Sequence, residues 1–204
     1  MKTGSEYALS PDKDGFNATV AHILAPLAFA SRAVLGRTLE GETGAAVELD
    51  FDQERLGADG AVFLIHKLRT LDDETGEPLN QTAEFFRRNG LDELAQVRNV
   101  LDGEMNIIAH RPLPLDVQEM VFHYGTRSWV RTWHEVVAPE KPGMASSFSL
   151  ANHREALDPR RPETVKSRAD DLLRSDIRDH LKGSLARDTY MLGKVMAAMV
   201  KGEM

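Results

Sequence analysis

The sequence predicts an α+β fold, with a small, mostly antiparallel sheet (residues 45–137) packed by an N-terminal helix and a long C-terminal helical section. Two patterns support this. Apolar residues recur at helical spacing from residue 16 and again after residue 162, whereas they alternate with polar residues near residue 50. The chain has 204 residues, 42% hydrophobic and 28% charged, which is typical of one globular domain.

The N-terminal region divides into two parts. Residues 1–15 are polar and rich in Gly, Pro, Asp and Ser, and they predict a flexible arm. Residues 16–204 are then expected to form a single globular domain. An apolar stripe from Phe16 to Leu35 predicts its first helix. Pro26 should kink or divide that helix, because proline removes a backbone donor and clashes with the preceding turn.

Two strand-like segments come next. Val47, Leu49 and Phe51 alternate with acidic residues, which is typical of a half-buried strand with an acidic outer face. The near-continuous apolar run at residues 61–68 predicts a more buried strand. Turn residues at 56–60 should join the two strands as an antiparallel hairpin.

The middle of the chain predicts shorter elements. Asn80 can cap a short helix that ends at Asn89 and Gly90, and residues 105–109 form a short strand candidate. Residues 128–137 are ambiguous: their tryptophans fit one helix face, but their Trp, Val and Thr content favours a strand. We weigh this segment slightly toward a strand.

The last section predicts two helices. Pro162 suits a first helical turn, and apolar stripes lie on both sides of Gly183. The second stripe is rich in methionine, whose flexible thioether suits adaptable apolar contacts. The sequence therefore favours self-association, as a homodimer, through this C-terminal helix. Packing of the helix on its own domain is the alternative.

Composition excludes several classes of chemistry. Cysteine is absent, which excludes disulfides, thiolate nucleophiles, zinc fingers and cysteine-ligated iron–sulfur clusters. The net charge of −7 argues against a nucleic-acid partner. The N-terminus lacks the pattern of a secretory signal, and no long uninterrupted apolar run is present. We therefore expect a soluble, cytoplasmic protein with no membrane partner.

Histidines are the first candidates for metal binding and catalysis. His110, His123 and His134 could hold a divalent transition metal, although their spacing matches no compact ligand motif. Three unconnected histidines are the alternative. His66, with His123, is the catalytic candidate, because a histidine inside an apolar strand needs a partner and a carboxylate partner would make it a general base. A core histidine bonded to a carbonyl is the simpler interpretation.

An aromatic cluster is the best candidate for a ligand pocket. Its members are Tyr124, Trp129, Arg131 and Trp133, with Arg111 nearby in the sequence. Aromatic rings can line a pocket while a guanidinium holds a carboxylate or phosphate. Both tryptophans could equally belong to the core.

Two functions remain open at this stage. The first is a homo-oligomeric binding or accessory protein with an aromatic, histidine and arginine pocket. The second is a small metal- or histidine-dependent enzyme that uses residues among His66, His110, His123 and His134. The first is slightly favoured because no catalytic motif is visible in the sequence.

Overall fold

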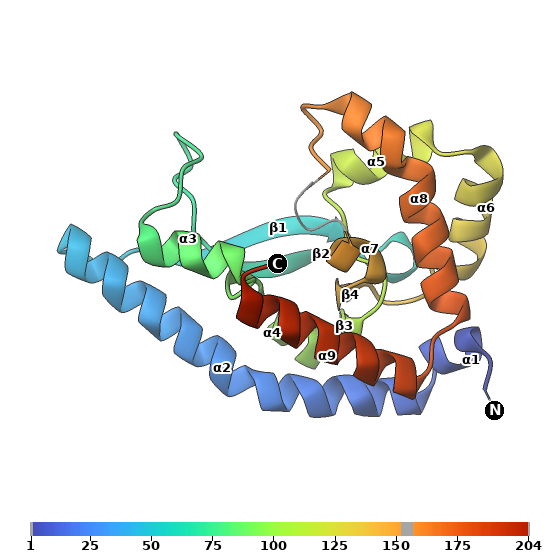
Figure 1. The fold of residues 1–204 in the computed structure, drawn as a ribbon, viewed down its shortest axis with the longest axis horizontal. Coiled ribbons are helices and arrows are strands. Elements are labelled where there is room, and N and C mark those ends of the chain that lie inside the picture. The colour runs from blue at the N-terminus through green and yellow to red at the C-terminus, as the bar shows by residue number, and fades with distance from the viewer. Residues whose placement is uncertain (1, 152–156, 204) are drawn as a thin grey trace.

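The computed structural model describes residues 2–151 and 157–203 and confirms the α+β class. Residues 1, 152–156 and 204, which belong to the predicted arm and domain, lie outside the described residues. Helices make up most of the chain (Figure 1). The elements in chain order are α1 (Gly4–Ala8), α2 (Pro11–Thr43), β1 (Asp50–Leu56), η1 (Ala58–Gly60), β2 (Val62–Leu68), α3 (Gln81–Arg88), η2 (Asp92–Gln96), α4 (Val97–Leu101), β3 (Asn106–Ile108), α5 (Leu115–Tyr124), α6 (Arg127–Val136), β4 (Gly143–Ala145), α7 (Ser147–Ala151), α8 (Pro162–Leu181) and α9 (Leu185–Lys201).

The N-terminal residues contain an ordered helical turn. The Thr3 hydroxyl accepts from the backbone N–H of Glu6 at 3.2 Å, and the Glu6 carboxylate accepts from the backbone N–H of Thr3 at 2.7 Å. This reciprocal pair is a capping box, which satisfies two donors that a helix start leaves free. Tyr7 is buried at 4% exposure. The division into a flexible arm and a single domain remains a prediction.

Helix α2 runs for 33 residues without a break. Pro26 lies inside it and does not divide it, although the helix bends along its length (Figure 1). One side packs against the rest of the chain through buried residues such as Val20, Ala21 and Leu35. The opposite side exposes large apolar residues, among them Ile23 and Phe29.

The strands form two small sheets. Strands β1 and β2 make the predicted antiparallel hairpin, with Asp52 opposite His66 and Arg55 opposite Phe63. Strands β3 and β4 pair in parallel, and β4 lies beyond the 45–137 range. A Cβ atom on Gly143 would lie 2.2 Å from the backbone nitrogen of Ala109, so this close strand contact requires glycine.

Residues 128–137 belong to helix α6 and its C-cap, so the preference for a strand was wrong. The physical reason is the burial pattern. Trp133 and Val137 are buried, with Trp129, Val130 and Val136 partly buried beside them. These positions recur at helical spacing and face α5 and α8. Tertiary packing of this face outweighs the strand propensity of its residues.

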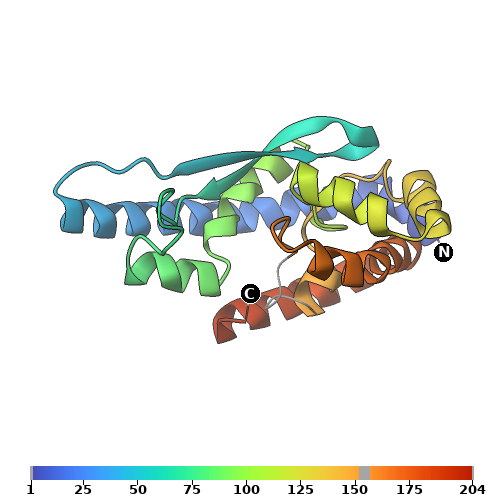
Figure 2. The same ribbon diagram turned by 90° about the horizontal axis from the view of Figure 1, so that it is seen from above.

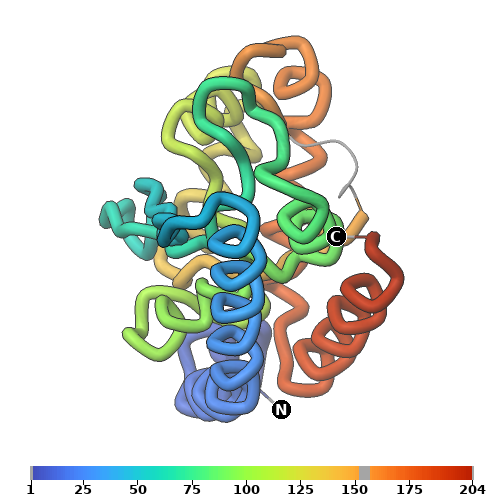
Figure 3. The backbone as a smooth tube through the Cα atoms, turned by 90° about the vertical axis from the view of Figure 1, so that its left-hand side faces the viewer, coloured from blue at the N-terminus to red at the C-terminus, as the bar shows by residue number. Residues whose placement is uncertain are grey.

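Three apolar clusters hold the elements together. The first joins α2, β2, α4, the β3–β4 sheet and α9. The second joins α5, α6 and α8, and the third joins the C-terminal half of α2 to the segment directly before β1, to β2 and to α3. Seen from above, the β1–β2 hairpin lies along one long side and the last helices along the other (Figure 2). Helices α2 and α9 run beside each other along one edge (Figures 1 and 3).

Candidate functional site

A cluster of charged side chains from separate elements surrounds Glu93 in η2. The Lys67 Nζ on β2 donates to Glu93 Oε1 at 2.9 Å, and Arg111 Nη2 donates to the same oxygen. Burial opposes ionisation of Glu93, but Arg111 and Lys67 outweigh it and hold the pKa of Glu93 below its usual range. The charge of Glu93 in turn raises the pKa of Arg111.

Asp92 lies immediately before Glu93 and is only 8% exposed. Burial, with the charge of Glu93 second, raises the pKa of Asp92 to about 6. Lys67 and Arg87 act in the opposite direction and favour the carboxylate. The two neighbouring acids therefore differ: Glu93 is ionised throughout the neutral range, whereas Asp92 exchanges its proton near neutral pH. Such divergence between adjacent carboxyl groups is common at reactive sites.

Local structure explains why these side chains meet. Asn99 on α4 accepts from the backbone N–H of His66 at 3.1 Å and donates to the carbonyl of Leu64 at 2.7 Å, so β2 is fixed to the helix that follows η2. Lys67 therefore faces Glu93. Arg111 is held by its second contact, in which Nη1 donates to the carbonyl of Met144 at 2.9 Å.

An apolar groove begins at this charged cluster. Glu93 is its one charged lining residue among the described residues, and the other lining side chains are aliphatic or methionine. Leu24 of α2 lines it, and α9 contributes a wall with Leu192, Val195, Met196 and Met199. The groove therefore combines one charged residue, Glu93, with apolar lining side chains, which suits an amphipathic ligand.

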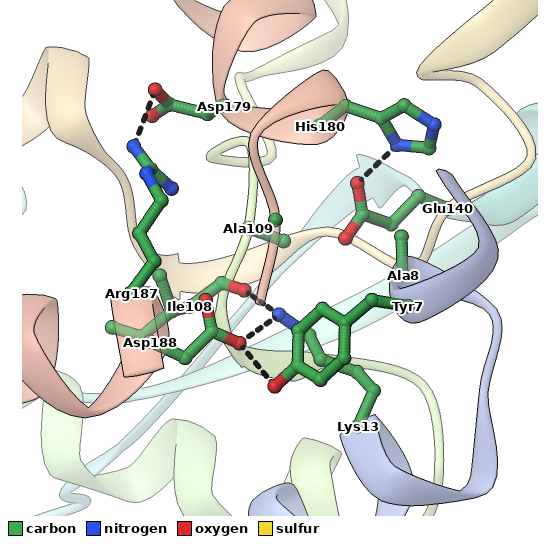
Figure 4. Close-up of a pocket in the computed structure, with 11 residues that line it drawn as sticks. Tyr7, Ala8, Lys13, Ile108, Ala109, Glu140, Asp179, His180, Arg187 and Asp188 are labelled. Atoms are coloured by element: carbon green, nitrogen blue, oxygen red, sulfur yellow. Dashed lines mark hydrogen bonds and ion pairs between the residues drawn. The ribbon is translucent and has the colours of Figure 1, made fainter. Parts of the chain in front are cut away.

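A second, smaller pocket lies where α1 and α2 meet α8 and α9 (Figure 4). Lys13 Nζ donates to Asp188 Oδ2 and to the carbonyl of Ile108, both at 2.5 Å, and the Tyr7 hydroxyl donates to Asp188 at 3.0 Å. His180 and Glu140 form a separate pair at 2.9 Å. The polar groups that line this pocket are paired with one another. Their contacts hold together the helices that surround the pocket.

The predicted catalytic histidines lie apart from the charged cluster. His66 pairs with Asp52 across the hairpin, with 2.7 Å between Nδ1 and Oδ1, and the Asp52 side chain is 43% exposed. His123 is exposed on α5, where its ring contacts Tyr124. Among the described residues, no hydrogen bond or ring contact joins His66 to His123, and a catalytic role for either remains a prediction.

The three predicted metal ligands make separate ring contacts. His110 packs edge-on against Trp133 with 5.4 Å between ring centroids, and His134 contacts Phe122 at 4.6 Å. Burial lowers the pKa of His110 to about 4, so its ring is neutral. In the part of the chain that the structure describes, no group of three or more His, Asp or Glu side chains is arranged to hold a metal ion. A metal at His110, His123 and His134 remains a prediction.

The aromatic cluster divides between core and surface. Trp133 is buried and its Nε1 donates to Asp176 at 3.1 Å. Trp129 stacks on Arg174 with 5.1 Å between ring centroid and guanidinium carbon, and Arg131 and Tyr124 are exposed. Arg111 belongs instead to the charged cluster. A ligand pocket of these residues remains a prediction.

Sequence reasoning missed Asp92, Glu93 and Lys67. Two acids at 92–93 interrupt the apolar helix pattern between Leu91 and Leu94, and that interruption was the available signal. It indicates charge on or near a buried face, which is costly unless the charge has a partner. The cationic partners of Glu93 are Lys67 and Arg111, and no local sequence pattern links these two residues to Glu93.

Known proteins are similar to this chain in sequence. Residues 13–202 match the family described as bacterial sugar transferase. The chain is 31% identical over 116 residues to an uncharacterized sugar transferase of Bacillus subtilis (strain 168), covering 52% of each chain. It is 32% identical over 97 residues to the UDP-glucose:undecaprenyl-phosphate glucose-1-phosphate transferase of Xanthomonas campestris pv. campestris, covering 40% of this chain and 20% of that one. The chain thus matches about half or less of each relative's length.

These matches correct the function predicted from the sequence. A soluble binding or accessory protein is wrong, as is a metal- or histidine-dependent enzyme, because the match is to sugar transferases. The expected homodimer contact is not supported either. The methionine-rich helix α9 packs Met191 and Val195 into the core of its own chain.

The expectation of a cytoplasmic protein without a membrane partner is also wrong. The Xanthomonas relative is named for undecaprenyl phosphate, which is a membrane lipid with a long isoprenoid chain. Helix α2 is long and apolar enough to cross a membrane, by length and composition, and most of its apolar stretch is not buried. The search for uninterrupted apolar runs missed it, because small and polar residues are interspersed along the helix.

The family match runs from the first turn of α2 to the end of α9. It therefore includes the hairpin that carries Lys67, the acidic pair of η2, the segment of Arg111 and the residues that line the groove. On this evidence the chain belongs to the bacterial sugar transferase family.

Proposed function

We propose that this chain transfers a sugar 1-phosphate from a nucleoside diphosphate sugar to a polyprenyl phosphate at a membrane. The observation that supports this most strongly is Asp92, a buried carboxyl group with a pKa of about 6 beside cationic side chains. It directly precedes Glu93, which lines the apolar groove. The Xanthomonas relative is named for a reaction of this class.

Charge is the main requirement of such a reaction. Both substrates carry phosphate groups, so the site must offset negative charge while two anions approach each other. Lys67, Arg87 and Arg111 supply positive charge around Asp92 and Glu93. Fixed cations that face a transferring phosphoryl group stabilise its transition state in related chemistry.

Asp92 is suited to act as the nucleophile. An acceptor phosphate attacks through an oxygen that is already ionised, so the reaction needs no general base at this position. Asp92 would instead attack the phosphorus that bears the sugar, breaking its bond to the bridging oxygen and releasing a nucleoside monophosphate. An oxygen of the polyprenyl phosphate would then attack the same phosphorus, freeing the Asp92 carboxylate and forming a polyprenyl diphosphate sugar.

The apolar groove suits the lipid acceptor. An isoprenoid phosphate has one anionic end and a branched apolar chain, and the groove has Glu93 with its cations at one end and apolar walls beyond. Met144, Met196 and Met199 line it, and methionine adapts to irregular apolar shapes. The exposed apolar side of α2 would place the groove next to the lipid.

The test is a transfer assay on the purified full chain in detergent. Labelled UDP-glucose and other nucleoside diphosphate sugars are offered with a polyprenyl phosphate, and lipid-linked product is extracted. Wild type should form product, and D92N should lose at least about a thousandfold of the rate. The matched control is D102N, which removes an exposed acid paired with Arg98 and should retain activity.

A second measurement tests the role of Asp92 directly. With the donor alone, intact mass spectrometry should show wild type carrying one added sugar phosphate, and D92N carrying none. Absence of product with every donor in the panel would contradict the proposed function. Product without the adduct, at undiminished rate in D92N, would contradict the role of Asp92 while leaving the function standing.

A further inference from the structure

Arg55, on β1, is a buried cation that lacks a carboxylate partner in the part of the chain that the structure describes. The residue is 5% exposed. Its Nη1 donates to the carbonyl of Glu54 at 3.0 Å and its Nη2 to the side-chain oxygen of Gln53 at 2.6 Å. Both acceptors are neutral. Its Nε, which is also buried, has no hydrogen-bond partner among the described residues.

Neighbouring charge makes burial of the charged Arg55 side chain less favourable. Burial first, and the positive charge of Arg111 second, lower the pKa of Arg55 to about 10. Glu93 and Asp116 act in the other direction without fully offsetting this. Glu93 is already shared by Lys67 and Arg111. A buried charge without a paired counterion is strongly unfavourable, so the arrangement calls for an additional anion.

A second unpaired donor lies on the helix that packs against β1. Gln118 of α5 is 5% exposed, and its Nε2 has no partner among the described residues. Arg55 also forms an isolated backbone bridge with Pro114, directly before α5. The hairpin and the start of α5 therefore each bring a buried donor without an acceptor to the same part of the fold. A group with several acceptor oxygens would satisfy both.

We propose that Arg55 and Arg111 together bind a phosphate group of the substrate. A guanidinium presents two parallel N–H donors that match two phosphate oxygens. The Arg111 side chain is 26% exposed and that of Lys67 20%, so an anion enters beside Arg111 and reaches Arg55 behind it. Which phosphate this is, that of the sugar donor or that of the lipid acceptor, rests on the proposed function. The anion site itself does not.

The first experiment uses inorganic pyrophosphate and inorganic phosphate with the full chain, without turnover. In wild type, each anion should raise the unfolding temperature with saturation. In R55M this response should be lost, or shifted to concentrations at least about tenfold higher. R98M is the matched control: Arg98 is exposed and forms an ion pair with Asp102 at the surface, so the anion response should persist.

Anion-free buffer separates binding from a structural role. Removing an uncompensated buried cation should leave R55M as stable as wild type or more stable, because methionine has similar volume without the charge. An R55M protein that is destabilised in this buffer and yet keeps the wild-type anion response would overturn the subsite. Should R55M fail to fold, R55K replaces it: it keeps the charge without the two-donor geometry, and an unchanged anion affinity would count equally against the proposal.

Steady-state kinetics of R55K then distinguish the two phosphates. A KM raised for the nucleoside diphosphate sugar alone assigns the donor, and a KM raised for the polyprenyl phosphate alone assigns the acceptor. A lower kcat with both KM values unchanged would contradict a binding role. Anion binding that depends on Arg55 in a protein that transfers no sugar would sustain the subsite and contradict the proposed function, so the two can fail separately.

Discussion

The Lys13 Nζ lies 2.5 Å from Asp188 Oδ2, and this contact joins the first turn of α2 to the first turn of α9. Both side chains are almost fully buried, at 4% and 2% exposure. Their pairing closes one end of the α2–α9 packing. The C-terminal part of α9 is held to the end of α3 by Asn89, whose Nδ2 donates to the carbonyl of Met199 at 2.5 Å. The two contacts fix α9 as one wall of the groove.

Breaking the Lys13–Asp188 pair should therefore destabilise the fold. K13M leaves Asp188 buried with the Tyr7 hydroxyl as its remaining partner, and removal of one member of a buried pair costs about 3–5 kcal/mol. Urea unfolding of the detergent-solubilised chain measures this. K2M removes the exposed Lys2–Asp12 pair and should change stability by less than about 1 kcal/mol. Equal effects of K13M and K2M on stability would contradict a stabilising role of the Lys13–Asp188 pair.

Loss of Glu93 should reduce activity more than stability. In E93Q the shared carboxylate of Lys67 and Arg111 becomes neutral, so both cations lose the charge that positions them. We expect at least about a hundredfold lower kcat/KM in the transfer assay, the range of a lost positioning contact. E84Q, on the exposed side of α3, is the control. A rate within about twofold of wild type would rule out a positioning role for Glu93.

Asp176 should make stability depend on pH. Burial raises the pKa of Asp176 from an ordinary value of 3.8 to about 8. The folded state therefore holds this proton more tightly, and the resulting stability is full below the unfolded pKa and is lost as pH rises toward 8. D176N keeps the acceptor for Trp133 without the ionisation.

Unfolding of wild type and D176N at pH 5 and pH 9 tests this. The stability of D176N relative to wild type should increase from pH 5 to pH 9 by roughly 2–4 kcal/mol. D171N, an exposed neighbour, should show no such gain. Parallel pH profiles for wild type and D176N would show that Asp176 is not protonated at neutral pH.

The exposed apolar side of α2 should hold the chain on lipid. Ile23 is 70% exposed and Phe29 76% exposed. Replacing both with serine removes apolar area that a lipid environment would cover, with a coefficient of about 25 cal/mol per Å². In flotation with phospholipid vesicles, I23S/F29S should shift from the vesicle fraction toward the soluble fraction. A T19A/H22A pair on the same helix should float as wild type does; equal flotation of all three proteins would contradict a role for this face.

Local patterns predicted much of the fold. Alternation near residue 50 and the run at 61–68 led to the β1–β2 hairpin, and Asn80 caps α3 as its side chain allows, accepting from the backbone N–H of Ala83 at 2.8 Å. These features depend on neighbours in sequence. Residues 128–137 were misjudged because their helix is decided by contacts with α5 and α8, which no local window contains.

The site was harder to predict, for a physical reason. Glu93 gains its ionised state from Lys67 and Arg111, which lie 26 and 18 residues away in sequence. The histidines were the first candidates because an imidazole in general titrates near neutral pH even where its surroundings do not shift its pKa. Asp92 reaches that range only through burial and its neighbour Glu93. Chemistry that the environment creates in an ordinary carboxyl group leaves little trace in composition.

The Lys13–Asp188 contact spans 175 residues and the Asn89–Met199 contact spans 110. Synthesis proceeds from the N-terminus, so α2 leaves the ribosome long before its partner on α9 exists, and contacts this distant in sequence close slowly. If the chain has the proposed function, a nascent chain would reach the lipid with its apolar helix complete and its groove still lacking one wall. Membrane attachment would then come before transferase activity.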